Sequence, residues 1–250
     1  VEFKTNSDTE VILHGFEIWG GEELCKRLKG MFAFAIWDGR SKELFFARDR
    51  FGEKPLYFSI EKGRFVLSSV LTTITRTSNS KYELSYNGLQ SYLQLGYCLT
   101  PFHIFKGVES LPPGHFGTFT EAGLQTHAYW DLHVETPPKK IEDALHKTNQ
   151  LLRKSIAGQL IADVPVGCLL SGGVDSTLIA AVAAELNQEL QLFTVRMPDS
   201  PLDESGLAVE TAKELGRKHH VIDAKPVSQD DFYELMGQFS EPLGDSSALG

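Results

Sequence analysis

The sequence has few cysteines, and they lie far apart. Cys25, Cys98 and Cys168 form no Cys-x-x-Cys pair and share no paired spacing. A disulfide framework requires cysteines that pair, and a thiolate zinc site requires closely spaced ligands. A disulfide-stabilised scaffold and a thiolate zinc site are therefore both excluded. The cysteine usage is typical of the reducing cytosol, and we expect a cytoplasmic protein.

Positive charge and long apolar runs are also scarce. The chain carries 24 Lys and Arg against 33 Asp and Glu, a net charge of −9, and no basic cluster interrupts this acidity. Nucleic-acid binding normally requires such a cluster. The longest apolar runs, 31–37 and 178–184, are far shorter than the roughly 20 residues that span a bilayer. We therefore expect neither a nucleic-acid nor a membrane partner.

The start of the sequence lacks both a signal peptide and an initiator methionine. Residues 1–8 contain neither a basic segment nor an apolar one, and the first residue is Val1. Residues 241–250 have loop-like sequence with nothing to complete a final element. We therefore expect the chain to come from the middle of a longer protein.

The first half of the chain predicts antiparallel strands. Of the 250 residues, 42% are hydrophobic, enough for one large or two modest domains. Short apolar runs alternate with turns and predict a meander whose strands are buried on both faces. The expected strands are 31–37, 44–47, 55–60, 64–68 and 129–130, with helices at 22–28 and 87–95. The first domain is therefore expected to be an α+β layered sheet.

Beyond residue 140 the hydrophobic pattern becomes helical. Apolar side chains recur every three or four positions and predict a helix with one core-facing stripe: Ile141, Leu145, Thr148, Leu152, Ile156 and Leu160. Buried strands then alternate with helices, which predicts a parallel α/β sheet. The expected strands are 164–170, 191–195 and 220–222, and the expected helices are 176–187 and 203–215. We assign a first domain to 1–130, a linker to 131–139 and a second domain to 140–250.

The loop between the first strand and the first helix of the second domain is the candidate ligand site. Ser171, Gly172, Gly173, Asp175 and Ser176 lie where a parallel sheet binds its ligands. Adjacent glycines let backbone N–H groups approach a phosphate, and the positive end of the helix dipole points at the same place. The alternative is a plain tight turn in which Asp175 is only the N-cap of the helix.

The kind of phosphate site can be narrowed from what the loop contains. The Walker lysine and the Gly-x-Gly-x-x-Gly spacing are both absent. A pyrophosphate bound here needs a divalent metal to balance its charge, and Asp175, the acid in the loop, is the natural Mg²⁺ ligand.

Several motifs in collinear order resemble glutamine-dependent asparagine synthetase. The Ser-Gly-Gly-x-Asp-Ser loop resembles that of the ATP pyrophosphatases. The second domain resembles the synthetase domain of the family at 164–176, 193–195, 203–205 and 241–247. The first domain resembles the later part of its class II glutaminase domain at 7–11, 30–38, 47–57 and 111–114.

The resemblance implies a fold and an activity. It implies a partial Ntn-hydrolase-type antiparallel layered sheet, followed by a partial PP-loop domain of the adenine-nucleotide α-hydrolase type. The implied reaction is the ATP-dependent amidation of aspartate through β-aspartyl-AMP, with ammonia from glutamine and release of AMP and pyrophosphate. Glutamine, aspartate and MgATP are the implied small-molecule partners. The oligomeric state is left open, and a homodimer is one alternative.

The resemblance also implies roles for single residues. Asp8 would bind the α-amino group of glutamine, although its segment also reads as the start of a helix, where it would be a cap or first-turn acid. Leu170 and Val195 would lie at the adenine. Ser171, Gly172, Gly173 and Ser176 would hold the pyrophosphate, and Asp175 its Mg²⁺.

The sequence departs from the family pattern at its catalytic residue. The family's glutaminase nucleophile is an N-terminal Cys, whereas residue 1 is Val1. We expect Cys25, Cys98 and Cys168 to be small apolar fillers. The second, acidic phosphate-binding segment of the family would follow Gly250. We therefore expect no catalytic residue in this chain and no activity of either kind from the chain alone.

Other interpretations remain open at this point. A relative of the same architecture could amidate another carboxylate or close a β-lactam ring, or the domains could be a non-catalytic glutamine or nucleotide sensor. His219 and His220 are adjacent in a strand and so point to opposite faces, which favours structural roles over a metal pair. Asp203 is more readily the N-cap of a helix than a metal ligand. Residues 48–50 are a charged strand-end network that either lines an ammonia route or braces a loop.

Overall fold

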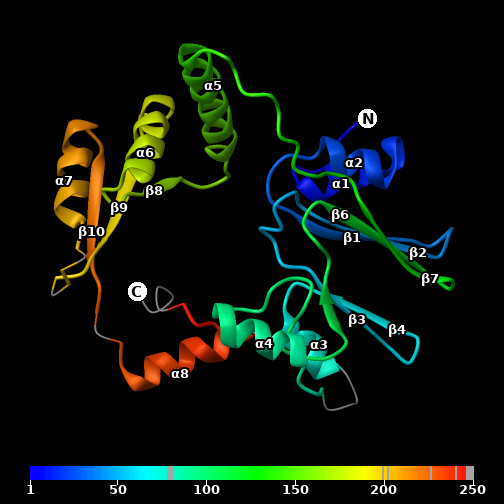
Figure 1. The fold of residues 1–250 in the computed structure, drawn as a ribbon. Coiled ribbons are helices and arrows are strands. Elements are labelled where there is room, and N and C mark those ends of the chain that lie inside the picture. Colours follow the sequence, from blue (N-terminus) through cyan, green and yellow to red (C-terminus); the bar gives the residue numbers. More distant parts are fainter. Residues whose placement is uncertain (78–81, 199, 202, 226, 240, 246–250) are drawn as a thin grey trace. The chain divides into compact units, whose positions relative to one another are not determined.

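The computed structural model describes residues 1–77, 82–198, 200–201, 203–225, 227–239 and 241–245. The chain divides into two compact units (Figure 1). The first comprises residues 1–133 together with residues 230–245, and the second comprises residues 134–229. Ser246 and Ser247, part of the motif at 241–247, lie outside the described residues. The domain limits at 130 and 140 stay a prediction.

The first unit contains two antiparallel sheets. One has the order β1–β2–β6–β7, formed by Ala33–Asp38, Glu43–Arg48, His115–Thr120 and Gly123–Ala128. The other has the order β4–β3–β5, formed by Arg64–Ser68, Tyr57–Glu61 and Val108–Ser110. The predicted hairpins at 31–47 and 55–68 are confirmed, but they do not continue one meander. The chain turns sharply after β2, and the second hairpin pairs in a sheet of its own.

Strand β2 joins the layers of the first unit because its side chains alternate between two cores. Phe45, 3% exposed, packs with Cys25 and Phe16 on the side where the helices lie. Phe46, fully buried, packs with Phe58 of the second sheet. In Figure 1, α1 and α2 lie on one side of the first sheet and β3 and β4 on the other. The predicted burial on both faces is confirmed for β2 but not for β1, where Trp37 is 61% exposed.

The helices of the first unit are short. They are α1 (Asp8–Trp19), α2 (Gly21–Arg27), α3 (Leu71–Thr77), α4 (Tyr86–Leu95) and, apart from its first residue, α8 (Gln229–Gln238). The helices expected at 22–28 and 87–95 are therefore confirmed. The start of α1 is fixed by Ser7, whose hydroxyl accepts the Thr9 N–H at 3.2 Å, as N-capping residues do. Asp8 is thus a first-turn acid and not the cap.

One predicted strand is wrong. Residues 129–130 do not form a strand, because the N–H groups of Tyr129 and Trp130 both donate to the Gly114 carbonyl, at 2.9 and 3.2 Å. This contact ends the ladder at Ala128. The actual edge strand, β7, precedes them.

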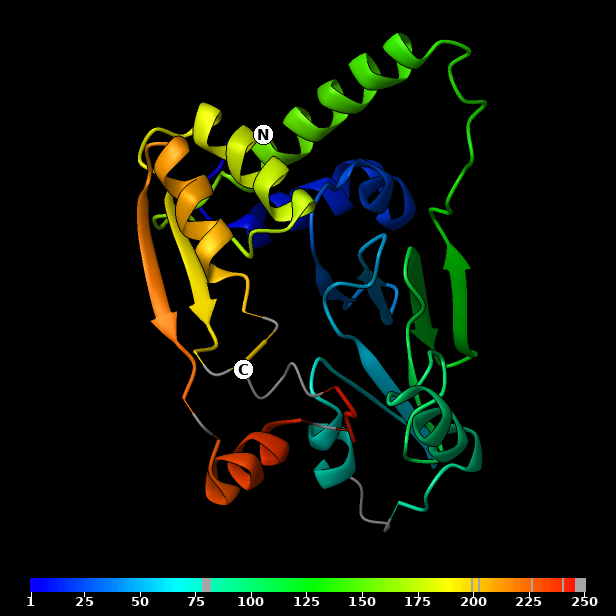
Figure 2. The ribbon, with the colours of Figure 1, turned by 60° about the vertical axis from the view of Figure 1, so that its left-hand side comes forward.

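The second unit is a parallel sheet with helices. Its strand order is β10–β9–β8, formed by Lys218–Asp223, Gln191–Arg196 and Gly167–Leu169. Figure 2 shows β9 and β10 side by side and running in the same direction. Helices α5 (Ile141–Gln159), α6 (Val174–Leu186) and α7 (Ser205–Glu214) pack with it. The predicted α/β alternation is confirmed, although the first strand is shorter than the expected 164–170.

The stripe predicted along α5 is only half correct. Ile156 is 7% exposed and packs in the core with Leu152, whereas Ile141 and Leu145 are 66% and 64% exposed. Only the C-terminal half of the helix therefore lies against the core of its unit. In the part of the chain that the structure describes, no helix is both long enough and apolar enough to cross a bilayer.

Candidate functional site

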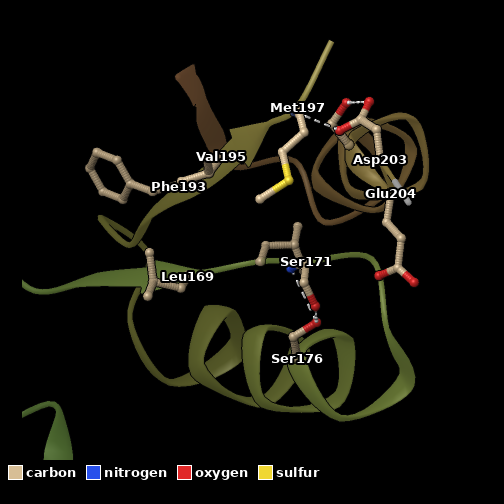
Figure 3. Close-up of a pocket in the computed structure, with 10 residues that line it drawn as sticks. Leu169, Ser171, Ser176, Phe193, Val195, Met197, Asp203 and Glu204 are labelled. Carbon is tan, nitrogen blue, oxygen red and sulfur yellow. Dashed lines mark hydrogen bonds between the residues drawn. The ribbon is translucent and has the colours of Figure 1, made fainter. Parts of the chain in front are cut away.

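A pocket of about 330 Å³ opens at the C-terminal ends of β8 and β9 (Figure 3). Its walls come from three places: the loop before α6, the end of β9 and the start of α7. The lining residues are Leu169, Leu170, Ser171, Ser176, Phe193, Val195, Met197, Asp203, Glu204 and Ser205. Ligands bind at this position in parallel α/β sheets, which agrees with the location expected from the sequence.

The loop itself is held in shape by two hydroxyl groups. The Ser176 hydroxyl donates to the Gly173 carbonyl at 3.1 Å and accepts the Ser171 N–H at 3.3 Å. It also lies 3.0 Å from the Ser171 hydroxyl, and Figure 3 shows the two groups facing one another. An anion that enters the loop would therefore meet two hydroxyl groups that lie close together, and Ser176 can donate to it once its hydroxyl turns away from the Gly173 carbonyl.

The start of α6 is open to a ligand. Its N-cap is Gly173, which has no side chain to accept the first N–H groups of the helix. Gly172 has a φ of +86°, a left-handed conformation that glycine adopts without strain. Asp175 follows in the first turn, with an exposed side chain that makes no capping bond. The alternative interpretation, in which Asp175 caps α6, is therefore wrong.

The strand ends beside the loop differ in how their backbone groups are used. Leu170 donates its N–H to Phe193 at 2.8 Å, and its carbonyl accepts the Thr194 hydroxyl at 2.6 Å. On the side of β10, the Ala224 N–H donates a hydrogen bond to the Arg196 carbonyl at 2.8 Å. Because backbone groups alternate sides along a strand, those of Val195 point to the β8 side, beyond the last residue of β8.

Side chains of β9 and of Met197, the residue just after it, form an apolar wall that the sequence analysis did not fully identify. Phe193, Val195 and Met197 line the pocket together. The signal was present, because residues two apart on a strand share a face. Extending the face of Val195 by one step in each direction finds the other two.

The acidic corner of the pocket differs from expectation. Glu204 occupies the N-cap position of α7 without a side-chain capping bond. Asp203 accepts the Met197 N–H at 3.0 Å and the Ser205 hydroxyl at 2.7 Å. These bonds hold the pKa of the Asp203 carboxyl below its usual value, and the Met197 N–H is the main cause. The prediction that Asp203 is the N-cap is therefore wrong, since it bridges a strand end and a helix.

The two adjacent histidines have separate partners. His219 lies 2.8 Å from the Thr194 hydroxyl, and His220 lies 2.7 Å from the Gln191 side chain and stacks on Phe193. Burial lowers the pKa of His219, so the neutral form is favoured. Among the described residues, no group of three or more His, Cys, Asp or Glu side chains could hold a metal ion.

In the first unit, the charged segment at 48–50 braces a loop. The Asp49 carboxylate is 1% exposed and accepts the N–H groups of Phe32, Phe51, Glu53 and Lys54 at 3.0–3.3 Å. The Arg48 guanidinium donates to three carbonyls, those of Gly52, Lys54 and Leu111. Of the two alternatives left open, these contacts favour the bracing role.

The remaining residues singled out from the sequence are also located. Asp8 is exposed at the start of α1, and its carboxylate lies 3.5 Å from the Ser7 hydroxyl. Cys25 is fully buried, and burial raises the pKa of its thiol to about 12. Cys98 and Cys168 are half-buried, and burial raises the pKa of both. Protonated thiols of this kind pack as small apolar groups.

Comparison with known proteins assigns both halves of the chain. Residues 1–130 match the family model of the glutamine amidotransferase domain, and residues 147–250 match that of asparagine synthase. The chain belongs to the glutamine-dependent asparagine synthetase family. The order of the two domains is the one expected from the motifs.

Two relatives illustrate the membership of this family. Asparagine synthetase [glutamine-hydrolyzing] 3 of Bacillus subtilis is 38% identical over 73% of this chain and 30% of its own length. A putative asparagine synthetase [glutamine-hydrolyzing] of Mycobacterium bovis is 35% identical over 99% of this chain and 39% of its own length. The chain therefore spans 30% of the length of the first relative and 39% of the length of the second.

Similarity to solved structures is weaker. A glutamine-dependent NAD⁺ synthetase from Acinetobacter baumannii aligns with 98% of this chain and 60% of its own, at 14% identity and a TM-score of 0.34. The assignment to the asparagine synthetase family therefore depends on the sequence matches and not on this likeness.

Proposed function

We propose that the full-length protein amidates aspartate to asparagine with ammonia from glutamine. The first unit would release the ammonia. The second would activate aspartate as β-aspartyl-AMP, with release of pyrophosphate. The observation that carries this proposal is the pocket at the ends of β8 and β9, because it joins an open phosphate loop to the apolar wall formed by Phe193, Val195 and Met197. The match to both family models supports the substrates.

The loop would bind the phosphates of ATP. The N–H groups of Gly172 and Gly173 and of the first turn of α6 supply donors, and the helix dipole favours the negative charge. Ser171 and Ser176 would give up their mutual contact and turn their hydroxyls to phosphate oxygens. Donors aimed at the departing pyrophosphate stabilise the charge that develops as the bond to the α-phosphate breaks.

Asp175 suits a divalent metal better than a structural role. Its carboxylate is exposed beside the loop and, among the described residues, accepts no hydrogen bond. Oxygen ligands of this kind are the ones that Mg²⁺ prefers. When bound, Mg²⁺ would neutralise phosphate charge, and Asp175 would hold it next to the loop.

The adenine would lie in the apolar slot. Phe193, Val195 and Met197 offer an apolar wall, and the Val195 N–H and carbonyl point to the side where a base edge would lie. Leu170 would contribute mainly through contact, because its own N–H and carbonyl already have partners.

In the first unit, Asp8 would bind the α-ammonium group of glutamine. Ser7 already caps α1, so the Asp8 carboxylate is not needed for that purpose. A carboxylate is a suitable partner for an ammonium group because a charge-assisted contact is stronger than a neutral one.

The deciding experiment supplies the full-length protein with aspartate, glutamine and MgATP. We expect asparagine together with stoichiometric AMP and pyrophosphate. Release of ADP would refute the proposal, because this loop is suited to holding a departing pyrophosphate. AMP and pyrophosphate without asparagine, obtained only with another carboxylate, would instead identify an amidotransferase or β-lactam-forming relative. Nucleotide binding without turnover of any acceptor would identify a sensor.

A further inference from the structure

The pocket contains a carboxylate that the proposed reaction does not use. Asp203 lies at the corner between β9 and α7, and both of its oxygens already have protein partners. One accepts the Met197 N–H at 3.0 Å, and the other accepts the Ser205 hydroxyl at 2.7 Å. Figure 3 shows the bond from Met197 reaching Asp203 across this corner. A carboxylate engaged in this way is poorly placed to bind a metal or a substrate directly.

What Asp203 holds in place is the first turn of α7. Ser205, its hydroxyl partner, is the first residue of that helix and is 6% exposed. The Glu204 carbonyl then accepts the N–H groups of Leu207 and Ala208 at 3.1 and 3.3 Å. Since Glu204 supplies no side-chain cap, the bridge from Asp203 is the side-chain anchor that ties this turn to the end of β9.

The first turn of α7 in turn contacts the phosphate loop. A Cβ on Gly172 would lie only 3.0 Å from the Glu204 carbonyl oxygen, 3.0 Å from the Leu207 Cβ and 3.2 Å from the Ala208 N. Gly172 is therefore packed against that turn with no room to spare. Because Gly172 has a φ of +86°, its backbone direction sets where the loop N–H groups point. A shift of α7 by a few tenths of an ångström would be transmitted to it.

We propose that Asp203 is a positioning residue for ATP: through the first turn of α7 it holds Gly172 and the phosphate loop in the binding conformation. This inference rests on the proposed function for the identity of the ligand. It assigns no contact between Asp203 and ATP. The low pKa of the Asp203 carboxyl is consistent with it, since the group stays ionised and accepts both bonds at neutral pH.

Three substitutions in the full-length protein separate positioning from direct contact. Asp203→Ala removes both bonds. Asp203→Asn removes the charge but keeps both bonds, because its amide oxygen can accept the Met197 N–H and its amide nitrogen can donate to the Ser205 oxygen. Ser205→Ala removes one bond and leaves the charge. The matched control is Asp223→Asn, an exposed acid near the end of β10 that pairs with Arg196.

Titration calorimetry with ATP and with adenosine gives the first readout. For Asp203→Ala we expect roughly tenfold weaker binding of ATP, which equals about 1.4 kcal/mol. Adenosine affinity should change by less than about threefold, since adenosine does not reach the loop, and a merely destabilised unit would weaken both. Ser205→Ala should lie between Asp203→Ala and the wild type, and Asp203→Asn and Asp223→Asn should match the wild type.

Amide hydrogen exchange of residues 171–176 gives a second readout that needs no ligand. We expect faster exchange in this loop for Asp203→Ala, and wild-type exchange for Asp203→Asn. If wild-type protein binds no ATP, the proposed function fails, and the exchange result still decides the positioning role. Unchanged exchange together with unchanged ATP affinity in folded Asp203→Ala would overturn the inference. An Asp203→Asn variant as weak as Asp203→Ala would also overturn it, because the charge and not the bridge would then matter. If Asp203→Ala does not fold, Ser205→Ala provides the same comparison.

Discussion

The substitution Asp49→Asn tests how the two sheets of the first unit are joined. The Asp49 carboxylate is 1% exposed and accepts four backbone N–H groups: three in the segment between β2 and β3, and that of Phe32, which precedes β1. An asparagine side chain fills the same space but offers only one oxygen, and its NH₂ group would face two of these donors. Two of the four bonds are therefore lost, and the two N–H groups stay buried beside another donor.

The size of the effect follows from this count. A hydrogen bond to a charged group contributes about 1.5–3 kcal/mol, so the loss of two should cost roughly 3–6 kcal/mol. The whole stability of a domain is only about 5–15 kcal/mol. With an m-value of about 2 kcal/mol per molar urea, the unfolding midpoint should fall by roughly 1.5–3 M.

The assay can report on the first unit alone. All three tryptophans, Trp19, Trp37 and Trp130, belong to that unit, so their fluorescence follows its unfolding in urea. The control is Asp38→Asn, in which an exposed hairpin carboxylate that accepts the Arg40 N–H at 2.8 Å loses its charge. We expect little change there. If Asp49→Asn unfolds within about 0.5 M of the wild type at an unchanged m-value, the bracing role is refuted.

The same residue predicts a pH dependence. Burial alone would raise the pKa of the Asp49 carboxyl, but its four backbone donors outweigh burial and hold that pKa below the usual value. Its contribution to stability is therefore fully present above the unfolded pKa of about 3.9 and is lost as the pH falls through the folded pKa. The difference in stability between wild type and Asp49→Asn should be constant near pH 7 and shrink in strong acid.

Three further substitutions test the two candidate sites. Asp175→Asn in the full-length protein should remove several kcal/mol of transition-state stabilisation, so that aspartate-dependent ATP–pyrophosphate exchange slows greatly while glutamine hydrolysis is unchanged. Asp163→Asn is the matched control, and equal loss of both activities in Asp175→Asn would contradict the metal role. Asp8→Asn should raise the glutamine KM roughly tenfold without affecting activity with ammonium salts; an unchanged KM would make Asp8 only a first-turn acid. Thr194→Val should leave the Leu170 carbonyl and the His219 ring without their shared partner, at a cost of about 1–3 kcal/mol, measurable as faster exchange of the Leu170 N–H; wild-type exchange would contradict this.

Elements whose signal is local could be predicted from the sequence. The hairpins at 31–47 and 55–68 carry their own apolar strands and turns, and α6 is an Ala-rich run between two strands. Strand β7 was missed because it is an edge strand whose last four residues are exposed, so it shows no apolar alternation. Helix α8 was missed for a similar reason, since none of its described residues is buried.

Long-range contacts were beyond the reach of sequence reasoning. Glu241 accepts the Ile104 N–H at 2.8 Å and lies 2.9 Å from the ring of His103, which is 5% exposed. This contact ties residues 230–245 to the first unit, although they follow the second unit in the chain. The motif that contains Glu241 was visible in the sequence, but a partner 138 residues away has no local signature.

In the candidate phosphate loop, too, some features have a local sequence signal and others depend on long-range contacts. Its glycines and serines could be identified because they lie within six consecutive residues between a strand and a helix. Besides the bonds of its own serines, the loop has two supports from elsewhere in the unit: Thr194 of β9 holds the Leu170 carbonyl at its start, and the first turn of α7, tied down by Asp203, confines Gly172. A Ser-Gly-Gly-x-Asp-Ser sequence moved to another strand–helix junction would lack both supports. Such a graft should therefore bind ATP weakly even though it carries the residues that we propose to contact the phosphates.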